Sequence, residues 1–546
     1  MSASPGPRFG YHGRPRQARE GESLLASLAR RGWPYLVRSI RYHRPRGPYC
    51  GTGDCTGCLV RVNGRPNVRA CRYVPREGDR VVSENSWPGP RFDLFGALDP
   101  LLPRGIDTLR GLRRPAFAAG LYQRVVRRLA GFGRASPSSF RLRTPEPRTV
   151  EAPCVIVGAG RSGRAVAAGL VREGLRPLLV ERRRGALAVA GADLLGGVTA
   201  TFLPPPSAPP TGFSLLAFSE EGGGYVLRTP SVVVATGGYD APLLFEGSDR
   251  PGVLSGDLAL SVPELPVERA VLVGGSARAL ELLQRLGPKV CAIVAPSEIH
   301  PQLVARAIEL GLPLYPRSRL VRAHGRARVR SVVLAPRGDG GRFTVPCDAV
   351  VLAHRRLPNA QLGFQAGATR RWRGEPGAYY PVLGGDGRTS VPGLWSVGSA
   401  ARPGGDDEQR VAATVAGILG REPVAAPAAV EEPDITPLLG YYRELLAERR
   451  HGKWVLCPCE DVLLTEVEEA VRRGYRGLEV IKRYTGVGTG LCQGRLCLPD
   501  TVLVLAAIEA RAPSSVGTIT QRPPLVPTPL GALAGLRDEF ADEVVP

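Results

Sequence analysis

Eight of the eleven cysteines in this 546-residue chain fall into two tight groups. The first group is Cys50, Cys55, Cys58 and Cys71, and the second is Cys457, Cys459, Cys492 and Cys497. The first 30 residues are Arg-rich and lack an apolar core, so no secretory signal is expected. In a chain that stays in a reducing compartment, clustered cysteines predict metal or redox chemistry rather than disulfides, and we expect a cytoplasmic location.

The first group has the spacing C-x4-C-x2-C, which is that of plant-type [2Fe–2S] ferredoxin loops, and Cys71 supplies the fourth candidate ligand. Three glycines inside the loop permit the sharp bends that a cluster requires, and backbone N–H groups can then point at the sulfurs. A zinc site is the alternative. Zinc sites more often combine two C-x2-C pairs, and only one such pair is present here.

The second group has the pattern C-x-C followed 32 residues later by C-x4-C. An amphipathic helix is expected over Leu464–Arg473, and a Gly-rich approach leads to Cys492. This pattern predicts a second [2Fe–2S] cluster, with zinc held by four thiolates as the alternative. The other cysteines, Cys154, Cys291 and Cys347, lie singly in apolar runs and are expected to be buried small hydrophobes.

Between the two groups lies a strand–helix–strand pattern. Pro153–Val157 has a buried-strand pattern, a G-x-G-x-x-G turn opens a helix, and Glu181 ends the next strand. The glycines allow a tight turn, approach of a pyrophosphate and close helix–strand packing, and the acid can bond ribose hydroxyls. The candidate cofactor-binding residues of this unit are Gly158, Ala159, Gly160, Ser162, Gly163, Glu181 and Arg182.

A second strand–helix–strand unit begins at Ala270. Its turn contains Gly274, Gly275 and Ser276 as candidate binding residues, but Ala279 replaces the third glycine. No acid ends the strand that follows, because Glu298 lies beyond Pro296. The unit either binds a second dinucleotide or is a packing unit that binds nothing.

The formal net charge is +22, and residues 1–150 contribute +18 of it through 28 Arg against ten acidic residues. This basicity raises the alternative of a nucleic-acid-binding protein with zinc-stabilised modules. We expect instead that the basic surface offsets the negative charge of an iron–sulfur cluster and steers an acidic partner. No apolar run is long enough for a transmembrane helix.

We expect an α/β multidomain chain, because short β-rich segments, then βαβ units and then helices follow one another along the sequence. Its predicted parts are a β-rich [2Fe–2S] domain (1–95), an Arg-rich connector with a helix at Gly120–Leu129 (96–150), a two-dinucleotide domain (151–422), a linker (422–432), a small helical [2Fe–2S] domain (440–512) and a tail (513–546).

Several motifs resemble those of one protein family. Tyr42–Gly47, the first Cys loop and Val68–Cys71 resemble the small ferredoxin-like subunit of hydrogen cyanide synthase and opine oxidase systems. Arg41–Gly47 and Trp87-Pro88 are similar to the α subunit of heterotetrameric sarcosine oxidase. The resemblance implies a β-grasp ferredoxin fold for this module, in which His43 is expected to be structural.

Two further motifs resemble those of two-dinucleotide flavoproteins. Val232–Gly238 resembles their Ala-Thr-Gly strand end, which adds Ala235, Thr236 and Gly237 as candidate cofactor residues. Gly393–Ala400 resembles their second FAD motif, although Ser399, after Gly398, stands where an Asp normally contacts the ribityl chain. The motifs favour FAD as the cofactor. The alternatives are NAD in its place, as in the related sarcosine oxidase α fold, or a site that binds nothing. The second Cys group resembles the bacterioferritin-associated ferredoxin module.

The resemblance implies an electron-transfer subunit of a multisubunit amine or amino-acid dehydrogenase or oxidase, a family that includes dye-linked proline dehydrogenase. A partner β subunit of the glycine and sarcosine oxidase type, with its own FAD, would oxidise the C–N bond of sarcosine, proline, glycine or an opine. The alternative is a self-contained NADH-dependent FAD and iron–sulfur oxidoreductase. The chain ends at residue 546, before the folate-binding domain of sarcosine oxidase α, so tetrahydrofolate-coupled demethylation is not expected.

Overall fold

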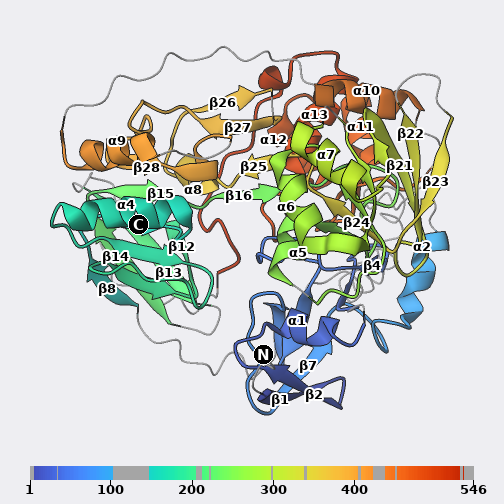
Figure 1. Ribbon diagram of the computed structural model, residues 1–546, viewed down its shortest axis with the longest axis horizontal. Coiled ribbons are helices and arrows are strands. Elements are labelled where there is room, and N and C mark those ends of the chain that lie inside the picture. The colour runs from blue at the N-terminus through green and yellow to red at the C-terminus, as the bar shows by residue number, and fades with distance from the viewer. Residues whose placement is uncertain are drawn as a thin grey trace, which may run out of the picture.

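The computed structural model places three modules around a common centre (Figure 1). It describes residues 5–32, 35–101, 147–203, 212–219, 223–262, 264–296, 299–336, 341–374, 376–403, 408–421, 437–448, 452–528, 533 and 536. The expected helix at Gly120–Leu129 and the expected linker at 422–432 lie outside these residues.

The N-terminal module is a five-stranded sheet with the order β2-β1-β7-β5-β6. The hairpin of β1 and β2 is followed by the short helix α1, and β7 returns parallel to β1. This is the β-grasp arrangement, as expected. Ser23 caps α1, whose leucines are buried against the sheet. The elements are β1 (Pro5–Tyr11), β2 (Arg14–Arg19), α1 (Leu24–Ala29), β3 (Val37–Arg38), β4 (Pro45–Arg46), β5 (Leu59–Val62), β6 (Arg65–Arg69), β7 (Asp79–Ser83), η1 (Leu94–Ala97) and α2 (Leu98–Leu101).

The first dinucleotide unit is a five-stranded parallel sheet with the order β11-β10-β9-β15-β28. Helix α4 crosses from β9 to β10 and packs against α9, where Gly169 lies against Val415. A four-stranded sheet, β12-β13-β14-β8, forms the adjoining layer (Figure 1). The elements are β8 (Arg148–Glu151), β9 (Val155–Val157), α4 (Arg161–Arg172), β10 (Leu178–Glu181), β11 (Asp193–Gly196), β12 (Val198–Phe202), β13 (Phe213–Ser219), β14 (Gly224–Thr229), β15 (Val232–Val234), β28 (Leu394–Ser396), η4 (Gly398–Ala400) and α9 (Glu408–Ile418).

The second dinucleotide unit repeats this plan with the parallel order β17-β24-β18-β19-β20. A three-stranded antiparallel sheet, β21-β22-β23, lies beside it. The elements are β17 (Val253–Ser255), α5 (Gly256–Ser261), β18 (Ala270–Val273), α6 (Ala277–Leu286), η3 (Gly287–Lys289), β19 (Val290–Val294), α7 (Pro301–Glu309), β20 (Leu314–Tyr315), β21 (Ser318–His324), β22 (Ser331–Pro336), β23 (Phe343–Pro346) and β24 (Ala349–Leu352).

Two antiparallel strands, β16 and β25, carry the chain between the two units, since each follows a strand of one unit and leads to the other. Their bounds are β16 (Gly238–Asp240) and β25 (Arg356–Pro358), and α8 (Gln361–Gln365), β26 (Arg370–Arg373) and β27 (Ala378–Pro381) complete this region. The chain therefore leaves and re-enters the first unit, as two-dinucleotide folds do.

The C-terminal module is helical, as expected, and its described residues contain helices beyond the one predicted over 464–473. The expected helix over 464–473 is α11, and a second helix, α12, separates it from the Gly-rich approach to Cys492. The elements are α10 (Pro437–Glu448), β29 (Val455–Cys457), β30 (Val462–Leu463), α11 (Leu464–Arg472), α12 (Leu478–Thr485), α13 (Leu498–Ile508) and η5 (Pro513–Val516). No helix in the described part of the chain is long and apolar enough to span a membrane.

The three modules share buried surface. One hydrophobic cluster contains Cys50 and Cys55 of the first module, Val271 and Val350 of the second dinucleotide unit, and Leu503 of α13. Because fully buried side chains of separate modules touch one another, the modules form one body rather than independent domains.

Candidate functional site

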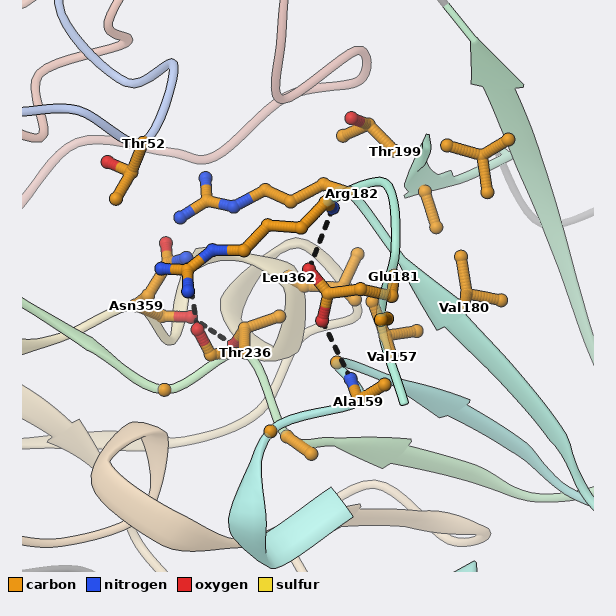
Figure 2. Close-up of a pocket in the computed structure, with 18 of the residues that line it drawn as sticks. Thr52, Val157, Ala159, Val180, Glu181, Arg182, Thr199, Thr236, Asn359 and Leu362 are labelled. Atoms are coloured by element: carbon orange, nitrogen blue, oxygen red, sulfur yellow. Dashed lines mark hydrogen bonds between the residues drawn. The ribbon is translucent and has the colours of Figure 1, made fainter. Parts of the chain in front are cut away.

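A cavity of about 540 Å³ opens at the carboxyl ends of the strands of the first dinucleotide unit (Figure 2). Its size is within the range of small-molecule sites. It is lined by Gly158, Ala159, Gly160, Arg164, Glu181, Arg182, Thr236, Gly237 and Asn359 of this domain and by Thr52, Arg495, Leu525 and Val526 from other parts of the chain. All three modules therefore contribute to one cavity.

Two glycines of the turn before α4 are closely packed, and a third borders open space. Gly158 has a φ of +113°, and a Cβ there would clash with the carbonyl of Ala235. A Cβ on Gly163 would clash with the carbonyl of Gly158. A Cβ on Gly160, the N-cap of α4, would have no atom within 4 Å. The space beside Gly160 and the helix N-terminus is suited to a phosphate group.

Arg164 adds a positive charge at the same place, and the sequence analysis missed it. It lies in the first turn of α4 and lines the cavity, and its Nε is buried with no hydrogen-bond partner among the described residues. An unpaired buried donor is costly unless a ligand satisfies it. The donor set therefore fits the anionic part of a dinucleotide.

Glu181 ends β10 and is held rigidly at the cavity wall. Its carboxylate accepts hydrogen bonds from the backbone N–H groups of Ala159 (2.8 Å) and Arg183 (2.9 Å), as Figure 2 shows for Ala159. Arg182 next to it turns toward the first Cys loop, where it donates two bonds to Asp54 (2.8 and 3.0 Å). The acid is thus placed for ribose hydroxyls, and Arg182 is engaged elsewhere rather than with a 2′-phosphate.

The motif residues after β15 also reach the cavity. Ala235, Thr236 and Gly237 line it, and the Thr236 hydroxyl donates to the backbone carbonyl of Asn359 (2.5 Å). Gly398 and Ser399, in contrast, are absent from the cavity lining. Gly398 packs against α4, because a Cβ there would lie 2.8 Å from Ser162 Oγ. Gly398 and Ser399 therefore belong to the first unit but do not line its cavity.

The second dinucleotide unit has the same turn and a different environment. Gly274 packs against Ala353, and Ser276 is the N-cap of α6. Arg278, in the first turn of α6, donates to Asp240 (3.1 Å), Asp257 (2.6 Å) and Glu281 (2.7 Å). The cavity at Gly160 does not extend to Gly274, Gly275 or Ser276. Protein carboxylates therefore neutralise the charge of Arg278 at this helix N-terminus, although its Nε, like that of Arg164, has no hydrogen-bond partner among the described residues.

Burial raises the pKa of Asp240, and the nearby charge of Asp257 raises it further, against the effect of Arg278 and Arg356. Arg356 contacts both carboxylates, at 3.3 Å from Asp240 and 3.0 Å from Asp257. These four side chains form a closed ionic cluster between the two units.

Cys50, Cys55 and Cys58 lie in one loop, and Cys71, which follows β6, lies against it. Cys50 raises the pKa of the Cys55 and Cys71 thiols, and Cys58 raises that of Cys71 as well, so the four thiols lie close together. The backbone N–H groups of Thr52, Asp54 and Cys55 donate to Cys50 Sγ at 3.3 to 3.4 Å. These three bonds reach a cysteine sulfur, and N–H groups directed at cluster sulfides stay a prediction. Cys71 is half-buried, and the other three are buried.

The cysteines of the second group also lie close together. Cys492 raises the pKa of the Cys459 thiol, and Cys457 raises that of the Cys497 thiol. In the described ranges, no three or more His, Cys, Asp or Glu side chains are arranged to hold a metal ion.

One carboxylate connects the two thiol groups and the dinucleotide cavity. Asp54, buried between Cys50 and Cys55, accepts from Arg182 of the first unit, from Arg495 (2.7 Å) between Cys492 and Cys497, and from the Thr52 hydroxyl (2.8 Å). Burial raises its pKa, but the two guanidinium groups dominate and lower it well below its usual range. Asp54 is therefore ionised, and neither Asp54 nor Arg495 was among the predicted site residues.

A second ionic junction holds the modules together at the segment Tyr42–Gly47. Arg46 pairs with Asp249, in the loop after β16, and with Asp461, in the turn after Cys459. Asp461 also accepts from the backbone N–H of Arg41 (2.8 Å). The segment is conspicuous in the sequence, but its partners are more than 200 positions away and could not be identified there.

His43 lies in the same segment and has the structural role that we expected. It is buried, its Nδ1 is 2.8 Å from Asp93 Oδ2, and its ring packs against Phe95. Of the single cysteines, Cys154 and Cys347 are buried as expected, whereas Cys291 is only half-buried. Burial raises the pKa values of Cys154 and Cys347 to about 12, and burial raises that of Cys291. High thiol pKa values indicate inert side chains.

Comparison with known proteins identifies the two end modules. Residues 8–86 match the family described as a 2Fe-2S iron-sulfur cluster binding domain, and residues 451–536 match the sarcosine oxidase A3 domain. The second match extends past the boundary at 512 that the sequence suggested. It includes Leu525, whose backbone N–H donates to Thr201 Oγ1 (3.4 Å) beside the cavity. Leu525 and Val526, assigned to a tail, are thus cavity residues.

Whole-chain comparison gives the same relatives. The chain is 28% identical to the sarcosine oxidase α subunit of Rhizobium meliloti over 96% of this chain and 57% of that protein. It is 40% identical to hydrogen cyanide synthase subunit HcnA of Pseudomonas aeruginosa over 82 residues, 15% of this chain and 74% of HcnA. The chain therefore spans little more than half the length of the sarcosine oxidase α subunit.

Among solved structures, L-proline dehydrogenase from P. horikoshii has a similar fold, with a TM-score of 0.67 and 20% identity over 98% of each chain. The fold, the two matched domains and the curated relatives agree. The chain belongs to the family of sarcosine oxidase α subunits, opine oxidase A subunits and hydrogen cyanide synthase subunits, and it has an N-terminal [2Fe–2S]-binding domain.

Proposed function

We propose that this chain is the electron-transfer subunit of an oxidoreductase complex that acts on the C–N bond of an amine or amino acid. The observation that carries the proposal is the meeting of a dinucleotide cavity and two four-thiol groups at Asp54. Such a meeting suits the transfer of electrons between cofactors that the protein holds in fixed positions.

The residues present fit a dinucleotide and two clusters. FAD is the proposed dinucleotide, with NAD as the alternative. The α4 N-terminus at Gly160, together with Arg164, would hold the pyrophosphate, and Glu181 would bond a ribose. Bound FAD would supply the exchange between hydride and single electrons. The proposed cluster ligands are Cys50, Cys55, Cys58 and Cys71, and Cys457, Cys459, Cys492 and Cys497.

A partner subunit would carry out the oxidation itself. In the proposal this β subunit resembles glycine and sarcosine oxidases and carries its own FAD, and the substrate is sarcosine, proline, glycine or an opine. The names of the relatives support this class of substrate and complex. All eleven cysteines are free thiols, which agrees with a reducing, cytoplasmic compartment.

The self-contained NADH-dependent alternative needs a second dinucleotide site. Arg278 and its carboxylate partners occupy the helix N-terminus where the pyrophosphate would bind. This arrangement favours a second unit that packs rather than binds.

The test is made on the full chain, purified anaerobically alone and with a co-expressed β-type partner. We expect about four iron and four sulfide per chain, a bound dinucleotide, and dye reduction by one of the four substrates only in the presence of the partner. Zinc without sulfide would refute the clusters. Rapid bleaching of the flavin of the isolated chain by NADH would refute the subunit role.

A further inference from the structure

The two thiol groups touch each other through a single side chain. The Thr56 hydroxyl, between Cys55 and Cys58 of the first group, donates to Cys459 Sγ of the second group at 3.7 Å. Both residues are buried. This contact crosses 403 positions of the sequence and is shielded from water.

Glycines pack tightly within each of the two loops. A Cβ on Gly57 would clash with the carbonyl of Gly47, and a Cβ on Gly490 would lie 2.5 Å from the Cβ of Cys459. Asp54 holds the loops in register, because it accepts from Arg495 in the second loop while it lies in the first. Packing and an ion pair therefore fix the distance between the two thiol groups.

A hydrogen bond to a ligand sulfur stabilises negative charge on it. A cluster gains negative charge when it is reduced, so such a bond favours the reduced form and raises the reduction potential. Thr56 belongs to the loop of one cluster and acts on a ligand of the other. Its effect is therefore expected on the C-terminal cluster and not on its own.

We propose that Thr56 raises the reduction potential of the C-terminal cluster and that single electrons pass directly between the two clusters across the Thr56–Cys459 contact. In this step the N-terminal cluster loses one electron and is oxidised, and the C-terminal cluster gains it and is reduced. No bond to a ligand is broken and no proton is transferred. The inference rests on the proposed function, because it requires both clusters. Thr56 is a positioning residue, and so is Asp54.

The test compares Thr56→Val, which removes the hydroxyl, with Thr56→Ser, which keeps it, in the anaerobic full chain. A third variant, Thr52→Val, removes a hydroxyl of the same loop that donates to Asp54 rather than to a sulfur. The readout is a redox titration followed by electron paramagnetic resonance, with Cys457→Ser to assign the C-terminal signal. For Thr56→Val we expect the ratio of reduced to oxidised C-terminal cluster at a given potential to fall about tenfold, which is 59 mV for one electron.

The N-terminal cluster of Thr56→Val and both clusters of Thr56→Ser are expected to keep their potentials. In the unaltered chain the two reduced clusters should broaden each other's signals, which reports their proximity without any substitution. Unchanged C-terminal potential in a Thr56→Val chain with both clusters would overturn the inference and leave the proposed function intact. Absence of broadening would overturn the direct step. Absence of a second cluster would overturn the proposed function itself.

Discussion

The two dinucleotide units share one backbone plan and differ in what meets the turn of each. Gly158 packs against Ala235 and Gly274 packs against Ala353, each at the end of the neighbouring strand. At the turn of the first unit, the helix N-terminus faces a cavity that Glu181 lines. At the turn of the second unit, Arg278 instead forms ion pairs with Asp240 and Asp257. We therefore expect that the backbone motif alone does not make a binding site. In this interpretation, the side chains that face the helix N-terminus decide whether a ligand or protein groups meet its free N–H donors.

The largest effect should come from filling the space beside Gly160. Gly160→Leu places a side chain where no protein atom lies within 4 Å, at a φ of −71° that any residue adopts. We expect the fold to persist and dinucleotide affinity to fall about 100-fold, or about 2.7 kcal/mol, measured by calorimetry. Ser276→Leu, at the equivalent position of the second unit, should leave the affinity unchanged. An equal loss in both variants would show that the second unit also binds.

A smaller effect is expected from opening the ionic cluster of the second unit. Arg278→Ala leaves the buried carboxylates of Asp240 and Asp257 with Arg356 as their remaining cation. The free energy of unfolding should fall by about 2 kcal/mol. This loss is smaller than that for breaking a fully buried ion pair, because one cation remains. Chemical denaturation measures it. Arg285→Ala, exposed on the same helix, is the control, and a gain of dinucleotide binding in Arg278→Ala would show that the arginine blocks a working site.

The smallest effect concerns pH. Where the first unit has Thr236, the second has His354, and burial, followed by the charge of Arg355, lowers the pKa of His354 well below its usual value. As the pH falls, His354 is therefore protonated in the unfolded chain before it is protonated in the folded chain. Stability from this group is complete above about pH 6.5 and falls at lower pH by up to about 1.4 kcal/mol per unit.

His354→Gln should reduce that slope in the unfolding free energy between pH 6.5 and 5.5, since the glutamine does not titrate. His300→Gln, on the exposed surface of the same unit, should retain it. An unchanged slope in His354→Gln would mean that other groups carry the acid sensitivity.

The sequence predicted the strand–helix–strand units closely, because buried strands, glycine turns and helix periodicity are local signals. The strand expected over 153–157 is β9 (Val155–Val157), and the helix expected over 464–473 is α11 (Leu464–Arg472). Helix α12 was missed because it is short and lies between Gly-rich stretches. Leu525 and Val526 were missed because the Pro-rich segment around them has no periodicity.

The charge of the N-terminal region was interpreted from the sequence as an external surface. The structure shows that part of it is internal, because Arg44 and Arg46 pair with Asp249, and Arg41 pairs with Glu466. These partners are hundreds of positions apart in the chain, so only tertiary placement identifies them. The pairing of Asp54 with Arg495 could not be predicted from the sequence for the same reason, because the two residues lie 441 positions apart. The steering role of the remaining basic surface stays a prediction.

The ion pairs of Arg46 to Asp249 and Asp461 have a consequence for assembly. An 82-residue stretch of this chain is similar to HcnA, which is a separate subunit of hydrogen cyanide synthase. Here the corresponding module is covalently joined to the rest, so its contacts form within one molecule rather than between two. A few polar contacts then suffice to keep the modules docked. The alignment of the two thiol groups is therefore independent of protein concentration, and dilution should not separate them.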